Sequence, residues 1–296
     1  MEKFVEKAAT LIEALPYIQS FQDKIVVVKL GGSVMDNKSY VGSILRDVVF
    51  MHTVGMKPVI VHGGGGIISD MMRKKGLSPR FVQGLRITDK ETMDVVEDAL
   101  VNIINRDLVE IIRGFKGKAE GHSGKEYGIV RVKKSGPVME KDANGVMQAI
   151  DLGFVGEVNH IGCGPIHDIL VRGKIPVIAS LGLGDDQMTY NVNADVVASE
   201  MAIQLKAEKL VFLTDVQGVM KDPENIESLM TSLKLEMVEQ LLNEGAVAGG
   251  MIPKLKSCAR AVKNSVHKTH IVDGRMQHSL LLEIFTDEGV GTQIVP

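Results

Sequence analysis

The 296-residue sequence lacks a surplus of charge of one sign, a rich set of cysteines and any long hydrophobic run. Its 34 lysines and arginines against 37 aspartates and glutamates give a net charge of −3, so nothing indicates a nucleic-acid partner. No apolar stretch approaches the roughly 18 residues of a membrane span, and residues 1–4 do not begin a secretory signal. The two distant cysteines, Cys163 and Cys258, fit a reducing compartment. We therefore expect a cytoplasmic protein without a membrane or nucleic-acid partner.

Several familiar active-site motifs are also missing. The sequence contains no Gly-Lys-Ser or Gly-Lys-Thr, hence no Walker A loop, and no G-x-G-x-x-G. Protein-kinase signatures, His-Glu-x-x-His and Gly-x-Ser-x-Gly are absent as well. A nucleotide would therefore need a different kind of phosphate site, although a small phosphorylated ligand needs only a local group of backbone donors.

Short apolar runs, many of them rich in β-branched residues, are spaced along the chain at 24–30, 57–61, 175–179, 209–213 and 270–272. Runs of this length are typical of strands buried on both faces of a parallel sheet. Apolar residues at helical spacing lie between them, at 95–111 and 196–205. This alternation predicts an α/β fold, an open αβα sandwich with a mainly parallel central sheet, in which ligands bind beyond the carboxyl ends of the strands.

Two regions depart from this alternation. Residues 114–160 are rich in glycine and lysine, and their short strand-like pieces predict antiparallel hairpins at one side. Residues 1–22 carry an apolar seam at helical spacing, which Pro16 should kink or interrupt because proline lacks an N–H and crowds the preceding turn. The seam can pack on its own domain or form an interface. It consists of Phe4, Ala8, Leu11, Leu15 and Ile18.

Two glycine-rich segments follow predicted strands. Lys29 ends the first run just before Gly31 and Gly32, where a buried ammonium is costly unless an anion is near, although the lysine could also snorkel from an edge strand. His62 precedes four glycines, which either let a ligand approach the backbone closely or form a plain flexible turn. We interpret His62 itself as structural, or as a residue that supports the site from behind the residues in contact with the ligand, rather than as catalytic.

Three later segments place polar residues just before predicted helices. Arg86 stands near a helix start that Asp89 can cap, and Lys254 opens a helix further along the chain. Between them, three polar residues alternate and would share one face of an extended segment: Asn191, Asn193 and Asp195. Each segment alone fits a helix cap or a solvated turn as well as a binding site. Together they favour a site.

Six motifs, in order along the chain, resemble those of the amino acid kinase family: Val28-Lys-Leu-Gly-Gly32, Val61-His-Gly-Gly-Gly65, Gly84-Leu-Arg-Ile-Thr88, Asn191-Val-Asn-Ala-Asp195, Leu213-Thr-Asp-Val-Gln-Gly-Val219 and Gly249-Gly-Met-Ile-Pro-Lys254. The resemblance covers essentially the whole chain. It implies the amino acid kinase fold for residues 23–296, with an acceptor-binding lobe over about 23–180 and an ATP-binding lobe over about 181–296. One departure is Gly66, where many members have proline, and this could loosen the loop.

The resemblance implies transfer of the γ-phosphoryl group of ATP to the side-chain carboxylate of N-acetyl-L-glutamate, a step of arginine biosynthesis. A carboxylate of this type has a pKa near ~4.3, so it needs no general base and the difficulty is electrostatic. Lys29 and Lys254 are then expected to neutralise charge in the transition state, with Asp195 holding both lysines. Mg²⁺ would arrive with ATP, coordinated mainly by phosphates and water rather than by a dedicated protein cage.

The remaining motif residues follow from the same resemblance. Arg86 is expected to grip the α-carboxylate of the acceptor through a bidentate contact that lysine could not reproduce. The acceptor would also contact Gly64, Gly65, Asn191 and Asn193. The phosphates and the nucleotide would contact Gly31, Gly32, Gly64, Thr214, Asp215 and Gly218.

Other activities remain open within this fold. An enzyme acting on an aminoadipate derivative could share nearly every motif, because one methylene changes binding by only about 1–3 kcal/mol. Glutamate 5-kinase, aspartokinase, carbamate kinase and UMP kinase match less well on the acceptor side. A non-catalytic nucleotide sensor should have lost a lysine or Asp195, and Lys29, Lys254 and Asp195 are all present.

The resemblance also implies regulation. Members with an N-terminal helix of this kind use it to link three dimers into a hexamer, and L-arginine inhibits them. We therefore expect residues 1–22 to interlace with their counterpart, and an arginine site between this helix and the C-terminal part, away from the acceptor. A carboxylate there could pair with the guanidinium of arginine. The site residues implied are Tyr17, His270, Glu283 and Gly289.

Overall fold

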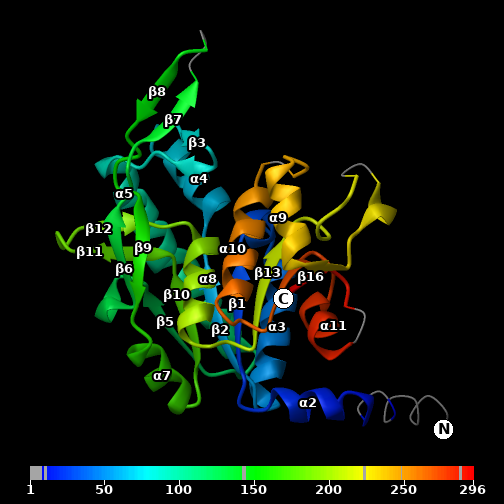
Figure 1. Ribbon diagram of the computed structural model, residues 1–296. Helices are drawn as coiled ribbons and strands as arrows, with labels where there is room; N and C mark the ends of the chain where they lie inside the picture. The colour runs from blue at the N-terminus through cyan, green and yellow to red at the C-terminus, as the bar shows by residue number, and fades with distance from the viewer. Residues whose placement is uncertain (1–8, 10–11, 142–144, 223–224, 248, 287–288) are drawn as a thin grey trace.

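A computed structural model describes residues 9, 12–141, 145–222, 225–247, 249–286 and 289–296. Its centre is an eight-stranded sheet with the order β14-β16-β15-β13-β1-β2-β10-β5 (Figure 1). Neighbouring strands run parallel except for the pair β15–β16, which confirms the mainly parallel sheet. The strands are β1 (Ile25–Leu30), β2 (Lys57–His62), β5 (Ala119–Ser123), β10 (Ile175–Ala179), β13 (Lys209–Thr214), β14 (Ser232–Lys234), β15 (Lys268–Asp273) and β16 (Thr292–Val295).

Helices cover both faces of this sheet and confirm the αβα sandwich. One face is covered by α7 (Gly164–Val171), α8 (Ala194–Gln204), α9 (Leu235–Asn243) and α10 (Met251–Lys263). The other is covered by α3 (Lys38–Thr53), α4 (Gly65–Lys74), helices between residues 90 and 114, and α11 (Ser279–Phe285). The side chains of β1 alternate between the two cores: Val26 and Val28 lie on the α3 side, and Val27 lies on the α8 side. None of the helices in the described ranges has the length and hydrophobicity to cross a bilayer.

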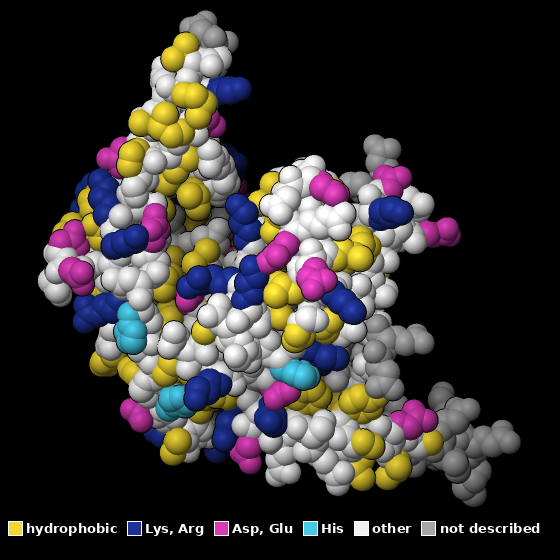
Figure 2. All heavy atoms as spheres, in the orientation of Figure 1, with side chains coloured by type: hydrophobic (Ala, Val, Ile, Leu, Met, Phe, Trp, Pro, Cys, Tyr) yellow, Lys and Arg dark blue, Asp and Glu magenta, His cyan; other side chains and the backbone are white. Residues whose placement is uncertain are grey.

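The remaining strands form smaller sheets beside the main one. A four-stranded sheet has the order β12 (Thr189–Asn191), β11 (Leu181–Gly184), β6 (Val130–Lys134) and β9 (Gly156–Ile161). Two further pairs are β3 (Phe81–Val82) with β4 (Leu85–Arg86), and β7 (Val138–Lys141) with β8 (Met147–Ile150). The β7–β8 pair projects from the body, and Figure 2 shows hydrophobic side chains gathered along it. Met139 and Met147 of this pair are exposed.

The expected antiparallel pairing of residues 114–160 is correct for β6–β9 and β7–β8 but wrong for residues 119–123. That segment is β5, which pairs in parallel with β10 at the edge of the main sheet. Its sequence, Ala-Glu-Gly-His-Ser, carries no apolar run because the three central residues are only partly buried at this edge. The pattern that identifies a central parallel strand is therefore missing from an edge strand.

The helical spacing over 95–111 corresponds to three consecutive helices. They are α5 (Lys90–Glu97), the π-helix η2 (Asp98–Asn105) and α6 (Arg106–Gly114). A π-helix bonds residues five apart, so it turns Leu100 and Asn105 toward the same side, and both are buried. Apolar spacing alone did not reveal this change of helix type. The short 3₁₀ helices are η1 (Gly32–Asp36), η3 (Glu126–Gly128) and η4 (Ile226–Ser228).

The N-terminal segment contains α2 (Leu15–Phe21), at the lower edge of the view in Figure 1. Pro16 lies in its first turn, where the missing N–H has no helical partner to lose, so the helical pattern is interrupted before α2 as predicted. Tyr17 packs edge-on against Phe285 of α11, with ring centroids 6.5 Å apart. Of the apolar seam, Leu15 is 43% exposed and Ile18 is half-buried, and the other members (Phe4, Ala8 and Leu11) lie outside the described residues.

Asp89 caps α5, as its place in the sequence predicts, and accepts a hydrogen bond from the Thr92 N–H at 2.8 Å. We expect Asp89→Ala to lower the free energy of unfolding by about 1 kcal/mol at neutral pH. The Thr92 N–H holds the pKa of Asp89 below its usual value. The contribution is therefore present above the unfolded-state pKa of about 3.9 and is lost as the pH falls through the lower folded-state pKa.

Urea unfolding of wild type and variant at neutral and acidic pH measures this difference. The control is Asp94→Ala on the same helix, which removes only an exposed ion pair with Lys90. An equal loss in both variants, or a loss that does not shrink at acidic pH, contradicts the assigned cap.

Candidate active site

Lys29 meets Asp195 because of the pleat of β1. Successive side chains alternate, so Lys29 points to the α8 side of the sheet together with Val27. Asp195 lies in the first turn of α8, and its Oδ1 is 2.7 Å from Lys29 Nζ. Both side chains are almost fully buried, at 7% and 6% exposure. An ion pair therefore compensates the buried ammonium, and Lys29 does not snorkel to solvent.

Lys254 completes a bridge around the same carboxylate. It lies in the first turn of α10, and its Nζ is 3.3 Å from Asp195 Oδ2. Burial by itself raises the pKa of Asp195, but the Lys29 and Lys254 ammonium groups outweigh it and hold the pKa below its usual value. Two cations thus share one anion, which leaves a surplus positive charge for an anionic ligand.

Two glycine turns lie beside this cluster. Gly31 and Gly32 lead from β1 into η1, and Gly63–Gly66 lead from β2 into α4. An added Cβ at Gly31 would overlap the Lys29 ammonium, so a larger residue there would require the lysine to leave its position against Asp195. Both turns line a cavity of about 200 Å³ together with Lys29 and Asp195. Backbone N–H groups at the starts of two helices thus lie beside the surplus charge.

Gly66 packs against a carboxylate. An added Cβ there would overlap Asp36 Oδ1, so the proline found at this position in many family members would not fit unless Asp36 moved. Burial and the nearby carboxylates of Asp70 and Asp215 raise the pKa of Asp36. In this chain, the absence of a side chain at Gly66 leaves space for Asp36 at the end of η1.

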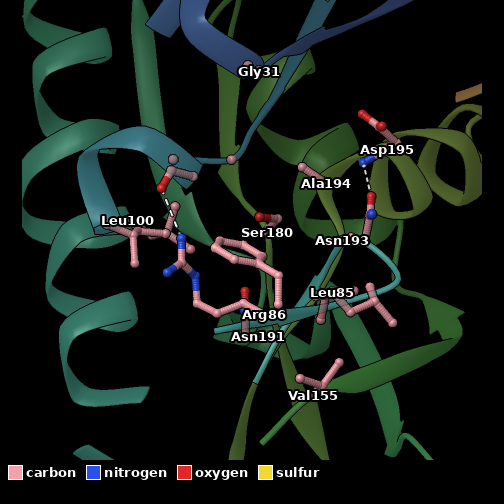
Figure 3. A pocket seen from close by; sticks show the side chains of 18 of the residues that line it. Gly31, Leu85, Arg86, Leu100, Val155, Ser180, Asn191, Asn193, Ala194 and Asp195 are labelled. Atoms are coloured by element: carbon pink, nitrogen blue, oxygen red, sulfur yellow. Dashed lines mark hydrogen bonds between the residues drawn. The ribbon is translucent and has the colours of Figure 1, made fainter. Parts of the chain in front are cut away.

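Arg86 lies on another side of the cavity from Asp195 (Figure 3). Its Nη2 donates to Gly65 O and Ser69 Oγ, both at 2.9 Å, and its guanidinium stacks over the Phe81 ring at 4.6 Å. Burial lowers the pKa of Arg86 to about 10, so it remains charged at neutral pH. Among the residues that the structure describes, no carboxylate pairs with it, and a ligand carboxylate would supply the missing charge.

The two asparagines line the same cavity in different ways. Asn191 ends β12 and donates from Nδ2 to Thr88 Oγ1 at 3.3 Å. Asn193 caps α8, and its Oδ1 accepts from the Asp195 N–H at 2.8 Å (Figure 3). The prediction of one extended face through Asp195 is therefore wrong, because the helix begins at Ala194. All three residues nevertheless reach the cavity.

The motif at 213–219 lies next to the glycine turn of β1. Asp215 Oδ2 accepts from Ser33 Oγ at 2.8 Å, and Thr214 ends β13 beside it. Burial raises the pKa of Asp215, but the Ser33 hydroxyl and other donors outweigh it and leave the pKa lowered. Gly218 packs on β16, where an added Cβ would overlap Thr292 Oγ1, so packing alone requires this glycine.

Sequence reasoning missed one polar residue and the apolar wall of the cavity. Ser180 directly follows β10, so the rule that ligands gather at strand ends could have identified it. The apolar residues come from several helices, strands and loops and share no sequence signal. They are Ile68, Phe81, Leu85, Leu100, Val155 and Val192.

A second cavity, of about 220 Å³, brings together the residues expected to bind arginine: Tyr17, His270, Glu283 and Gly289. They come from α2, β15, α11 and the loop after α11. Glu283 is buried, and its Oε1 lies 2.6 Å from His270 Nδ1. Its Oε2 accepts backbone N–H bonds at 2.7 and 3.0 Å, so the carboxylate is held firmly in place.

Lys209 also lines this second cavity, and sequence reasoning did not single it out. Its ammonium lies 4.9 Å from the centre of the Phe21 ring, and burial lowers its pKa to about 8. Among the described residues, no carboxylate lies within ion-pair distance of it. The sequence carried a signal for Lys209, namely a lysine within a buried strand, which is the same signal that identified Lys29. Lys209 is the first residue of its strand, and Lys29 stands near the end of its own.

Comparisons with known proteins identify the family. The amino acid kinase family matches residues 24–273. Acetylglutamate kinase from Moorella thermoacetica is 47% identical over 292 residues, covering 99% of this chain and 98% of that protein. Acetylglutamate kinase from Heliobacterium modesticaldum is 46% identical over 295 residues and covers 100% of both.

Solved structures share the fold. N-acetylglutamate synthase from Neisseria gonorrhoeae, complexed with coenzyme A and N-acetyl-glutamate, has a TM-score of 0.84 at 22% identity, covering 98% of this chain but 63% of the synthase chain. The same synthase complexed with coenzyme A and L-arginine has a TM-score of 0.80 at 21% identity. Giardia carbamate kinase has a TM-score of 0.66 at 17% identity, over 92% of this chain and 99% of that chain. On the match over residues 24–273 and the full-length relatives, the chain belongs to the amino acid kinase family.

Proposed function

We propose that this kinase transfers the γ-phosphoryl group of ATP to the side-chain carboxylate of N-acetyl-L-glutamate, in arginine biosynthesis. The observation that carries the proposal is the cavity lined by Lys29, Asp195 and, on another side, the charged Arg86, with Lys254 bound to the same Asp195 carboxylate. The full-length relatives at 47% and 46% identity, which bear the name acetylglutamate kinase, support this acceptor.

The chemistry requires charge neutralisation rather than proton transfer. The acceptor carboxylate is ionised at neutral pH, and it must approach a polyphosphate. Lys29 and Lys254 together carry two positive charges against the one negative charge of Asp195, and ion pairs of 2.7 and 3.3 Å hold the three side chains together. Preorganised charge of this kind stabilises a transition state without reorganising the site. Lys29 supports the transferring phosphoryl group, and Lys254 supports the ATP side.

The acceptor is gripped at its far end by Arg86. The guanidinium forms a bidentate contact with the α-carboxylate, while Asn191 donates a hydrogen bond and the apolar wall covers the methylenes and the acetyl group. Gly65 and Asn193 complete this side of the cavity. Residues 23–180 supply most of the acceptor side, as the two-lobe division implies, although Asn191 and Asp195 reach it from the second lobe.

The nucleotide side comprises the glycine turn at Gly31 and Gly32 and the segment from Thr214 to Gly218. Asp215, bonded to Ser33, faces this turn. Among the described residues, no three His, Cys, Asp or Glu side chains are spaced to hold a metal ion. Mg²⁺ would arrive with ATP and be held mainly by the phosphates and water, where it neutralises phosphate charge.

Trapping of the acyl phosphate with hydroxylamine tests this function. We expect N-acetylglutamate to give a higher kcat/KM than N-acetylaminoadipate, glutamate or aspartate.

Lys29→Ala and Lys254→Ala should each lower turnover by about 10²-fold or more, because each removes one electrostatic stabiliser. Both variants should fold, since neither empties an apolar core site. A higher kcat/KM for N-acetylaminoadipate would contradict the acceptor, and normal turnover in both variants would contradict the lysine roles.

Arg86→Lys tests the acceptor side separately. Replacing the planar fork with a point charge should raise the KM for the acceptor by about tenfold or more while the KM for ATP changes little. Steady-state titration of each substrate measures this. The matched control is Arg73→Lys, an exposed arginine on the neighbouring α4. A rise confined to the KM for ATP would show that Arg86 serves the nucleotide side and contradict its assignment to the acceptor.

We further infer that the second cavity binds L-arginine as an inhibitor and that residues 1–22 link dimers into a hexamer. Support comes from the second cavity, which is lined by residues of separate elements. There the Glu283 carboxylate, fixed by His270, can pair with the guanidinium of arginine, and Lys209 can pair with its carboxylate. The synthase that shares this fold has been solved with L-arginine. Because α2 contributes Tyr17 to this cavity, arginine binding and the N-terminal segment are connected.

Deleting residues 1–22 should leave an active dimer that is much less sensitive to arginine, because the deletion removes both the interface and Tyr17. Light scattering and an arginine titration of both proteins test this. Lys209→Gln in the full chain separates the two effects, since it should reduce arginine sensitivity and preserve the hexamer. A full-length protein that is dimeric and indifferent to millimolar arginine would overturn the regulatory proposal and leave the kinase proposal intact.

A further inference from the structure

His62 is fully buried, and the acceptor cavity does not include it among its lining residues. It ends β2 directly before the glycine turn that begins at Gly63. Alternation along β2 turns its ring to the same side as Ile60, away from α8 and toward η2. A polar ring buried there needs hydrogen-bond partners within the protein.

Asn105 of η2 determines where the proton of His62 resides. Its Nδ2 lies 2.9 Å from Val177 O, a group that can only accept, so this amide nitrogen is a donor. The same Nδ2 lies 3.0 Å from His62 Nε2, which must therefore be the unprotonated nitrogen. The proton is on Nδ1, which lies 3.2 Å from Gly63 O and donates to it. Burial lowers the pKa of His62 to about 4, so the ring stays neutral near pH 7.

The π-helix η2 packs tightly against the backbone at Gly64 and Gly121. An added Cβ at Gly64 would overlap Ile104 Cδ1 and come within 3.1 Å of Leu100 Cδ2. On the opposite side of Asn105, an added Cβ at Gly121 of β5 would overlap Asn105 Oδ1. Two glycines therefore make space for three side chains of η2. The tight fit fixes the position of the Asn105 amide relative to the glycine turn.

The bond to Gly63 O has a direct consequence for the active site. The Gly63 carbonyl and the Gly64 N–H belong to one planar peptide, so holding the oxygen fixes the direction of the N–H. Glycine peptides rotate more freely than others, so this peptide would otherwise sample several orientations. The Gly64 N–H is one of the backbone groups assigned to the phosphate.

We propose that His62 and Asn105 are positioning residues for phosphoryl transfer: Asn105 holds the Nδ1–H tautomer of His62, and His62 holds the Gly63–Gly64 peptide so that its N–H faces the transferred phosphoryl group. This inference rests on the proposed function, since it concerns the glycine turn of that same site. Neither side chain touches substrate. Their effect is on the rate of the chemical step rather than on substrate binding.

Kinetics of matched variants test the proposal. His62→Leu removes the donor and should lower kcat at least about tenfold, because a misplacement near 1 Å can cost roughly 10²-fold, while both KM values stay within about threefold. His62→Asn should recover most of this loss, since an asparagine Nδ2 stands where the histidine Nδ1 does. Asn105→Leu, which removes the amide, and Gly121→Ala, which displaces it, should reduce kcat in the same way. Asn102→Leu, an exposed asparagine on the same helix, is the control.

A merely structural role predicts instead that His62→Leu and His62→Asn lose activity and thermal stability in parallel. Normal kcat in a folded His62→Leu protein, or no recovery in His62→Asn, would overturn the proposal.

A spectroscopic measurement tests the tautomer without relying on activity. Long-range ¹H–¹⁵N spectra of the histidine-labelled chain should show His62 as a neutral Nδ1–H ring from about pH 5 to 8, and as a tautomer mixture in Asn105→Leu. An Nε2–H ring in the wild type would overturn the proposal. If the wild-type chain phosphorylates no acceptor, the proposed function fails, and this spectrum still decides whether His62 holds the Gly63 carbonyl.

Discussion

The buried bridge from Lys29 through Asp195 to Lys254 is the interaction on which the rest of the site depends. It joins a central strand to the first turns of α8 and α10, so one carboxylate sets the relative position of three elements. Removing Asp195 would leave two uncompensated ammonium groups in the interior, which is strongly destabilising, whereas removing either lysine leaves a neutral pair. The bridge also makes the net charge of the site positive, since two ammonium groups outweigh one carboxylate.

Two further buried cations have no carboxylate partner among the described residues, and each marks a cavity. Arg86 lines the cavity that also contains Lys29 and Asp195, and Lys209 lines the cavity beside α2 and α11. Lys209 begins β13 and Thr214 ends it, so the second cavity and the turn that carries Asp215 occupy opposite ends of a single central strand. In both cavities, uncompensated buried charge is the feature that points to an anionic group on a small molecule.

Glycine positions in the backbone shape this site by leaving space for neighbouring side chains. Gly31 leaves space for the Lys29 ammonium, Gly64 for Ile104, and Gly66 for Asp36. These glycines are therefore packing requirements as well as open backbone for a phosphate. The same openness makes their peptides free to rotate, and the bond from His62 to Gly63 O supplies a constraint that glycine lacks.

The sequence alone determined the parts of the fold that depend on local pattern. Continuous apolar runs identified the central strands, helical spacing identified α8, and the position of Asp89 identified a helix cap, because each of these is set by neighbours within a few residues. Polar residues at strand ends pointed to the site, since the carboxyl ends of parallel strands meet. The roles of Lys29, Lys254 and Asp195 as a group came from family resemblance.

Tertiary structure decided what depends on residues far apart in the chain. The edge position of β5, the π-helical turn that carries Asn105, and the use of Asn193 as a cap rather than on an extended face all follow from packing partners that no local window contains. The apolar wall around Arg86 and the second cavity around Lys209 have the same origin. The sequence supplies the charges, and only the folded chain decides which of them find a partner and which are left for a ligand.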